Sequence, residues 1–205
     1  MVIGVTGGYC SGKDVAAEIL ARYGIVEINE DKVGHRALEV LKPQITDTFG
    51  QRILAGNGAI DRKILGSIVF ADMDELRRLE RIVHPWMVEE TRRRIAAAGS
   101  SHAMINAAVL HRMGLHLLCD HVLIIHAPYL VRYLRARNRD GLGLRETLKR
   151  VRIQREQRQI AGIPKQFLNE KGANVDTVVV KNGGTKLALA KRLEALLSEL
   201  GIIGR

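Results

Sequence analysis

A glycine-rich segment near the start of the chain limits the possible folds more than any other feature. Residues 7–14 read Gly-Gly-Tyr-Cys-Ser-Gly-Lys-Asp, which has the spacing of a phosphate-binding loop, or P-loop. An apolar run, Val2–Thr6, precedes this segment, and a helical pattern over Lys13–Tyr23 follows it. Because a P-loop binds phosphate where it joins a strand to a helix, this context predicts an α/β fold that binds nucleotide phosphates. A glycine turn that only joins strand to helix is the alternative.

Four further short apolar runs predict the other strands of a sheet. They are Ile25–Ile28, Ala103–Val109, His121–Ala127 and Thr177–Val180, and an amphipathic helix over Leu187–Leu200 closes the chain. Continuous apolar runs are typical of strands that are buried on both faces of a parallel sheet. We therefore expect a parallel five-stranded sheet flanked by helices, with functional residues directly after the strands, where ligands bind in such folds.

The region between Val33 and Ala98 has a mainly helical pattern, which we expect to be interrupted at Pro43, at residues 55–58 and at Pro85. It predicts a helical insertion beside the sheet. At 205 residues, the chain suits one compact domain rather than two.

The positive charge of the chain is concentrated in one segment. The formal net charge is +10, and residues 132–158 contain ten basic and three acidic residues. Aromatic residues make up only 4% of the chain, so the stacking platform of a single-strand nucleic-acid binder is missing. A helix face in solvent is the usual role of such a segment, but beside a P-loop it favours cations that close over a triphosphate, with Arg139 the first to test.

The loop supplies most of the candidate binding residues. Lys13 is expected to contact the transferred phosphoryl group, while the backbone N–H groups of the loop surround the β-phosphate. Asp14 stands where a Ser or Thr hydroxyl normally ligates Mg²⁺; its carboxylate is a suitable ligand but adds a negative charge near the phosphates. The predicted ATP-binding residues in this part of the chain are Gly8, Tyr9, Cys10, Ser11, Gly12, Lys13, Asp14 and Val15.

Asp31 follows the second predicted strand, at the expected edge of the same cleft. A carboxylate there is placed to accept the proton of an attacking hydroxyl, but Asp31 is an equally good candidate for the N-cap of the helix that begins at Lys32. His84, which precedes Pro85, is more typical of a helix boundary than of catalysis.

Features of targeting are missing from the sequence. No apolar run approaches the roughly 20 residues of a membrane span, and the first residues do not resemble a signal peptide. Cys10 and Cys119 have no metal-binding spacing, and we expect no disulfide. These observations predict a cytoplasmic protein.

Taken in order along the chain, the motifs resemble those of the dephospho-CoA kinase family. The matching elements are Thr6-Gly7-Gly8, Ser11-Gly12-Lys13, Asp31-Lys32, His35, Phe49-Gly50, Gly58, Arg62, Leu65, Val69-Phe70, His84-Pro85, residues 139–142, Arg150, Gln154, Asn182 and Gly184. The resemblance implies a nucleotide-binding core (1–32, 99–130 and 171–205), a helical dephospho-CoA region (33–98) and a lid (131–170).

The resemblance also implies the reaction, in which ATP with Mg²⁺ phosphorylates the ribose 3′-hydroxyl of dephospho-CoA in the last step of CoA biosynthesis. It places Asp31 on the presumed base, Lys13 on the phosphate-binding lysine, Arg139 in the lid and Asn182 near the adenine of ATP. Arg62, His84 and Asp31 are the implied acceptor-binding residues, and Asp14 is the candidate metal ligand. ATP and dephospho-CoA are the expected partners, without nucleic acid, membrane or an obligatory protein.

Four departures from the family pattern lie around the expected cleft. Cys10 replaces a Gly, Asp14 a Ser or Thr, and Asn29 the first Asp of an Asp-x-Asp motif, while residues 108–112 read Ala-Val-Leu-His-Arg instead of Pro-Leu-Leu-Phe/Val-Glu. If the Gly of the family has a positive φ, either Cys10 is strained there or the loop has a different shape. Arg112 in place of Glu is a candidate compensation for Asp14. A divergent ATP-binding homologue without this activity, or another small-molecule P-loop kinase, remains an alternative.

Overall fold

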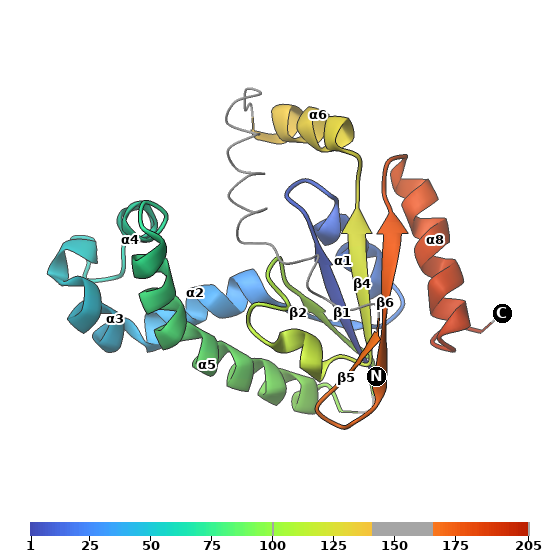
Figure 1. Ribbon diagram of the computed structural model, residues 1–205, viewed down its shortest axis with the longest axis horizontal. Helices are drawn as coiled ribbons and strands as arrows, with labels where there is room; N and C mark the ends of the chain where they lie inside the picture. Colours follow the sequence, from blue (N-terminus) through green and yellow to red (C-terminus); the bar gives the residue numbers. More distant parts are fainter. Residues whose placement is uncertain (100, 141–165, 205) are drawn as a thin grey trace. The chain divides into compact units, whose positions relative to one another are not determined.

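The computed structural model describes residues 1–99, 101–140 and 166–204 (Figure 1). The chain divides into two compact units, Met1–Ile28 with Ile95–Arg205, and Asn29–Arg94. We call them the sheet unit and the helical unit. Most of the predicted lid, residues 141–165, lies outside the described residues.

A mostly parallel sheet forms the centre of the sheet unit, which confirms the predicted α/β class. Its strands are β1 (Val2–Gly7), β2 (Val26–Asn29), β3 (Ala103–Asn106), β4 (His121–His126), β5 (Gln166–Leu168) and β6 (Asn174–Lys181). Their order is β2-β3-β1-β4-β6-β5, so β1 lies between β3 and β4 and is parallel to both. The described sheet has six strands rather than the predicted five, because the short strand β5 adds to β6 in the antiparallel sense.

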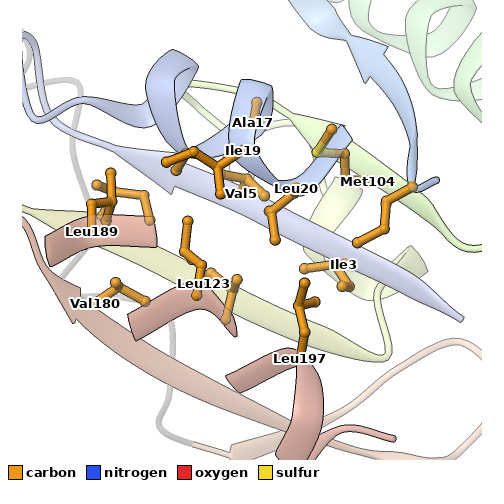
Figure 2. Close-up of a cluster of buried hydrophobic side chains, with 14 residues drawn as sticks. Ile3, Val5, Ala17, Ile19, Leu20, Met104, Leu123, Val180, Leu189 and Leu197 are labelled. Atoms are coloured by element: carbon orange, nitrogen blue, oxygen red, sulfur yellow. The ribbon is translucent and has the colours of Figure 1, made fainter. Parts of the chain in front are cut away.

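Helices α1 (Lys13–Ala21) and α8 (Lys186–Glu199) pack on one face of this sheet. The buried cluster between these helices and the sheet includes Ile3, Val5, Leu20, Leu123 and Leu189 (Figure 2). Burying a side chain of this size contributes roughly 1.5–3 kcal/mol, so the cluster fixes the start of α1 against β1. The loop that joins these two elements is thereby held at both ends.

The opposite face of the sheet is covered by the segment between β3 and β4, which contains the short helix η2 (Leu115–Leu118). This packing is close at Gly4 in β1, where a Cβ atom would lie 2.7 Å from Leu110 Cδ2 and 2.8 Å from Cys119 Sγ. A larger residue at position 4 would therefore displace buried side chains. After β4, helix α6 (Tyr129–Asp140) leads out of the sheet unit's core.

The helical unit matches the predicted insertion in its secondary structure. It contains α2 (Glu30–Val40), α3 (Lys42–Phe49), η1 (Gln51–Ile53), α4 (Arg62–Val69) and most of α5 (Met73–Ala97). Pro43 lies in the first turn of α3, where the missing N–H is tolerated, and residues 55–58 separate η1 from α4, as expected.

The predicted interruption at Pro85 is wrong, because Pro85 lies inside the continuous helix α5. A proline removes one backbone hydrogen bond from a helix, and here buried side chains on both sides, Val83 and Met87 among them, hold the helix together. His84 is therefore an interior helix residue and not a boundary residue. No helix in the described ranges is both long enough and apolar enough to cross a membrane.

Candidate active site

The glycine loop connects the end of β1 to the start of α1, as the sequence predicts. The Ser11 N–H donates to the Gly8 carbonyl at 2.7 Å, which closes a tight turn. Gly12 is the N-cap of α1 and has a φ of 92°. A Cβ atom at Gly12 would lie 2.2 Å from Asn182 Nδ2, so both its backbone conformation and its surroundings require glycine.

Lys13 is held in place from two sides. It is only 9% exposed, and its Nζ donates to Asp14 Oδ1 at 2.8 Å and to Asn106 Oδ1. The Asn106 amide donates in turn to Glu27 Oε1 at 2.7 Å and to Asp14 Oδ1 at 3.3 Å. The ammonium group is therefore positioned at the loop before any phosphate binds.

Side chains from outside the loop bind two of its carbonyl oxygens. Arg132 Nε donates to the Tyr9 carbonyl at 2.7 Å, and the Ser11 carbonyl accepts from Arg135 Nη1 at 3.2 Å and from Asn182 Nδ2 at 2.8 Å. Burial lowers the pKa of the Arg132 guanidinium, which remains a cation because an arginine starts so high. These bonds fix the shape of the loop.

Cys10 adopts a left-handed backbone conformation with a φ of 57°, the one positive φ at a non-glycine residue in the described chain. The sequence-based expectation of strain at this position is therefore confirmed. Such a conformation costs an ordinary side chain about 1–2 kcal/mol. The surrounding hydrogen bonds of Tyr9 and Ser11 hold the residue there.

Asp31 lies in the first turn of α2 and is exposed. It is not the helix N-cap: that position belongs to Asn29, whose Oδ1 accepts from the N–H groups of Asp31 and Lys32 at 3.1 and 3.2 Å. The alternative role for Asp31 is therefore wrong, and Asn29, one of the departures from the family pattern, has a structural role of its own.

Glu30, next to Asp31, is a buried carboxyl that sequence reasoning missed. It is 4% exposed, and its Oε1 lies 2.8 Å from Thr91 Oγ1, which in turn lies 2.8 Å from the Met87 carbonyl. The Thr91 hydroxyl has both oxygens within donating distance, and its bond to Glu30 Oε1 favours the ionised carboxylate. The pKa of Glu30 is raised to about 7, mainly because the carboxyl is buried. The hydrogen bond from Thr91 and the charge of Arg94 lower the pKa by less, and the charge of Asp31 raises it slightly.

The helical unit contains an open cavity of about 650 Å³. Arg62 Nη1 lies 2.7 Å from His35 Nε2 at its edge, and Lys42 Nζ donates to the Gly58 carbonyl at 3.2 Å. The other lining residues are Leu38, Glu39, Asn57, Ala59 and Ile60. The cavity combines basic groups with an apolar wall.

The structure thus brings together part of the predicted site. Lys13, Asp14 and Asn182 meet at the loop, and Val15 packs against the hydrophobic core. Arg62 and His84 belong to the helical unit, with His84 half-buried in α5. Arg139 lies in the last turn of α6, and its side chain is outside the described residues. Asn106 was missed, although a polar residue at the end of an apolar strand was a usable signal.

A mostly parallel sheet, a glycine loop after its central strand and a buried lysine at the start of the next helix define the class of P-loop nucleotide-binding proteins. A family model described as dephospho-CoA kinase matches residues 1–185. Similar relatives include a dephospho-CoA kinase of Anaeromyxobacter dehalogenans, with 39% identity over 97% of this chain and 92% of the relative, and one of Geobacter sulfurreducens, with 36% identity over 95% and 96%.

Solved structures agree with this classification. A Thermus thermophilus protein has a TM-score of 0.77 and 28% identity, covering 98% of this chain and 97% of its own. A dephospho-CoA kinase from Campylobacter jejuni, at 22% identity over 97% and 96% of the two chains, has a TM-score of 0.64 and shares the fold. The chain belongs to the dephospho-CoA kinase family.

Proposed function

We propose that this protein catalyses the ATP-dependent phosphorylation of the ribose 3′-hydroxyl of dephospho-CoA, which yields coenzyme A and ADP. Family membership supports this reaction. The observation that carries it for this chain is Lys13, which the loop retains, buries and orients despite the changes at positions 10 and 14. A homologue that had lost nucleotide binding would have no need of a lysine positioned in this way.

In this reaction the 3′-hydroxyl oxygen bonds to the γ-phosphorus while the bond from that phosphorus to the β,γ-bridging oxygen breaks, and ADP leaves with the electron pair. Asp31 is the proposed acceptor of the hydroxyl proton. Its exposure leaves it open to a substrate, and the Asn29 cap fixes its backbone. Lys13 and the N–H groups at the start of α1 stabilise the charge on the phosphoryl oxygens.

Magnesium suits the oxygen donors at the loop. Asp14 and Glu27 both accept from the same Asn106 nitrogen, so their carboxylates converge on one region, and Mg²⁺ commonly binds one or two carboxylates together with substrate phosphates and water. When bound, the ion neutralises charge on the β- and γ-phosphates. Asp14 is the proposed protein ligand.

The cavity of the helical unit is the proposed site for part of dephospho-CoA. Arg62, His35 and Lys42 supply groups for anionic phosphates, and Leu38 and Ile60 supply apolar surface for an uncharged chain. The wider layout has 33–98 as the acceptor region, 131–170 as a lid with Arg139, and Asn182 near the adenine of ATP. Cytoplasmic location and ATP and dephospho-CoA as sufficient partners belong to the same proposal.

A coupled ADP-release assay with ATP and Mg²⁺ tests the reaction, with dephospho-CoA and a panel of nucleosides as acceptors. We expect turnover with dephospho-CoA alone, reduced by about 10²-fold or more in Asp31→Asn, as for loss of a general base. Asp47→Asn, an exposed Asp on α3 of the same unit, is the matched control and should keep wild-type turnover. ATP binding without turnover on any acceptor would favour the divergent homologue, and turnover on a nucleoside would favour another small-molecule kinase.

A further inference from the structure

The end of β3 and the start of α1 carry an unusual pair of residues. P-loop enzymes generally hold Mg²⁺ with a hydroxyl on the residue after the loop lysine and with an Asp at a nearby strand end. Here the residue after the lysine is Asp14, and the strand-end residue that contacts it is Asn106. The carboxylate, usually on the strand, is therefore on helix α1 as Asp14, and the neutral side chain, usually on the helix, is at the strand end as Asn106.

Hydrogen bonding fixes the orientation of the Asn106 amide, which is 1% exposed. Its Oδ1 must face Lys13 Nζ, since an ammonium only donates, and its Nδ2 must face the acceptors Glu27 and Asp14. These are the contacts observed. Asparagine can serve all three groups at once, whereas an Asp at position 106 could not donate to either carboxylate.

The charges around Lys13 also favour asparagine at position 106. Lys13 pairs directly with the Asp14 carboxylate, and the neutral Asn106 amide connects it to the carboxylate of Glu27. A third carboxylate at position 106 would place three negative charges around one cation, and like charges repel even where solvent screens the exposed Asp14 and Glu27 carboxylates in part. With Asp14 present, the charges therefore favour a neutral residue at position 106.

We propose that the charged metal ligand of the P-loop site has been exchanged in this chain from the strand end to helix α1, so that Asp14 carries it and Asn106 is a positioning residue that orients Asp14 and Lys13. This inference rests on the proposed function, because it concerns Mg²⁺ and ATP at the same loop. In the described residues no group of three or more His, Cys, Asp or Glu side chains could hold a metal by itself, so the ion relies on the nucleotide phosphates as well.

Calorimetric titration with the β,γ-imido analogue of ATP, with and without Mg²⁺, tests the exchange in Asp14→Ser, Asn106→Asp and the double variant. In the wild type we expect Mg²⁺ to tighten binding about tenfold or more, and in Asp14→Ser by less than about threefold. Metal-free binding should instead become about fivefold tighter in Asp14→Ser, because one negative charge near the phosphates is gone. A merely structural role for Asp14 would not reduce the Mg²⁺ effect while it tightens metal-free binding.

The double variant restores the arrangement of a hydroxyl on the helix and a carboxylate on the strand. We expect it to recover the Mg²⁺ effect to within about threefold of the wild type, while Asn106→Asp alone should weaken metal-free binding about fivefold. Glu18→Gln removes an exposed carboxylate of α1 that pairs with Lys186 and should match the wild type.

An unchanged Mg²⁺ effect in Asp14→Ser, or a double variant no better than Asp14→Ser, would overturn the exchange. A wild type that does not bind the analogue would overturn both this inference and the proposed function. Normal analogue binding without turnover of dephospho-CoA would count against the proposed function alone. Melting temperatures of all variants show whether each one is folded.

Discussion

The loop of the sheet unit and the cavity of the helical unit use polar groups in opposite ways. At the loop, the side chains of Lys13, Asn106, Asn182 and Arg132 are each less than one-tenth exposed and hydrogen-bonded to one another or to loop carbonyls. At the cavity, His35, Lys42 and Arg62 are exposed. The first set is held by burial and hydrogen bonds before substrate binds, whereas the second has only the exposed contacts of Arg62 with His35 and of Lys42 with Gly58.

This difference predicts that the two sets of groups affect different steps, the reaction rate and substrate binding. Preorganised groups act on charge that develops in the transition state without a further cost of ordering, so their loss should lower the rate. Exposed groups must be ordered by the ligand itself, so their loss should mainly weaken binding. Four variants test or refine this contrast.

Lys13→Met should have the largest effect. It keeps most of the buried volume but removes the positioned ammonium, and we expect kcat/KM to fall about 10³-fold, as for loss of a preorganised donor to a developing charge. Steady-state kinetics together with a melting curve measure this. Lys186→Met, which removes an exposed lysine from α8, should leave the kinetics unchanged. A fall of less than tenfold for Lys13→Met would contradict a preorganised role for the loop.

Glu30→Gln tests a polar group of the helical unit that is buried, unlike the exposed groups at the cavity. Between pH 4.5 and about 7 the folded protein keeps the Glu30 proton while the unfolded chain has lost it, so the wild-type free energy of unfolding falls as pH rises through this range. Gln cannot ionise but can still donate to Thr91. We expect equal stability at pH 4.5 and a variant more stable by up to about 3 kcal/mol at pH 8.

Urea unfolding of both proteins at several pH values measures the difference. Glu89→Gln, which changes an exposed carboxyl of α5, should follow the wild-type curve. A Glu30→Gln variant whose stability differs from the wild type by the same amount at every pH would show that folding does not raise the pKa of Glu30.

Arg62→Ala should affect binding and not rate. The loss of one exposed cation at the cavity is expected to raise the KM for dephospho-CoA about tenfold, the value of one charge-assisted hydrogen bond, with kcat and the KM for ATP unchanged. Arg77→Ala removes another exposed arginine of the helical unit, one that pairs with Asp74, and serves as the control. A fall in kcat for Arg62→Ala would instead place Arg62 among the groups that act on the transition state.

Cys10→Gly should have the smallest effect. Removing the side chain relieves the cost of the positive φ, but glycine adds freedom to the unfolded chain, so we expect a gain of up to about 1 kcal/mol. Gly114→Ala, at a φ of 73° in the left-handed region with open space around the new Cβ atom, should report a similar backbone cost with opposite sign. Denaturant unfolding compares the two, and a loss of stability in Cys10→Gly would mean that contacts of the thiol outweigh the strain.

The sequence predicted those features that depend on neighbouring residues. Five of the six described strands and the loop were recognised, because a continuous apolar run or a fixed glycine spacing is visible in a short stretch. Strand β5 was missed because three residues with one partly buried side chain form no clear pattern. The predicted interruption at Pro85 was wrong because α5 is kept continuous by tertiary packing, which a short stretch of sequence does not show.

The missed residues of the site have partners far along the chain. Asn106 bonds to Lys13 across 93 residues, and Glu30 to Thr91 across 61. Contacts between residues so far apart in the chain leave no recognisable spacing in a single sequence. The N-cap was assigned to Asp31 as an alternative because Asp and Asn are comparable caps, and only the backbone bonds distinguish them.

The central place of β1 in the sheet also has a consequence for how the protein is made. Its neighbours in the sheet, β3 and β4, begin about 100 residues later in the chain, so the first strand leaves the ribosome long before either partner exists. The intervening helices depend mainly on contacts nearer in sequence, which form faster. The phosphate-binding loop therefore acquires its final shape late in synthesis, and the nascent chain cannot take up nucleotide until its second half has been translated.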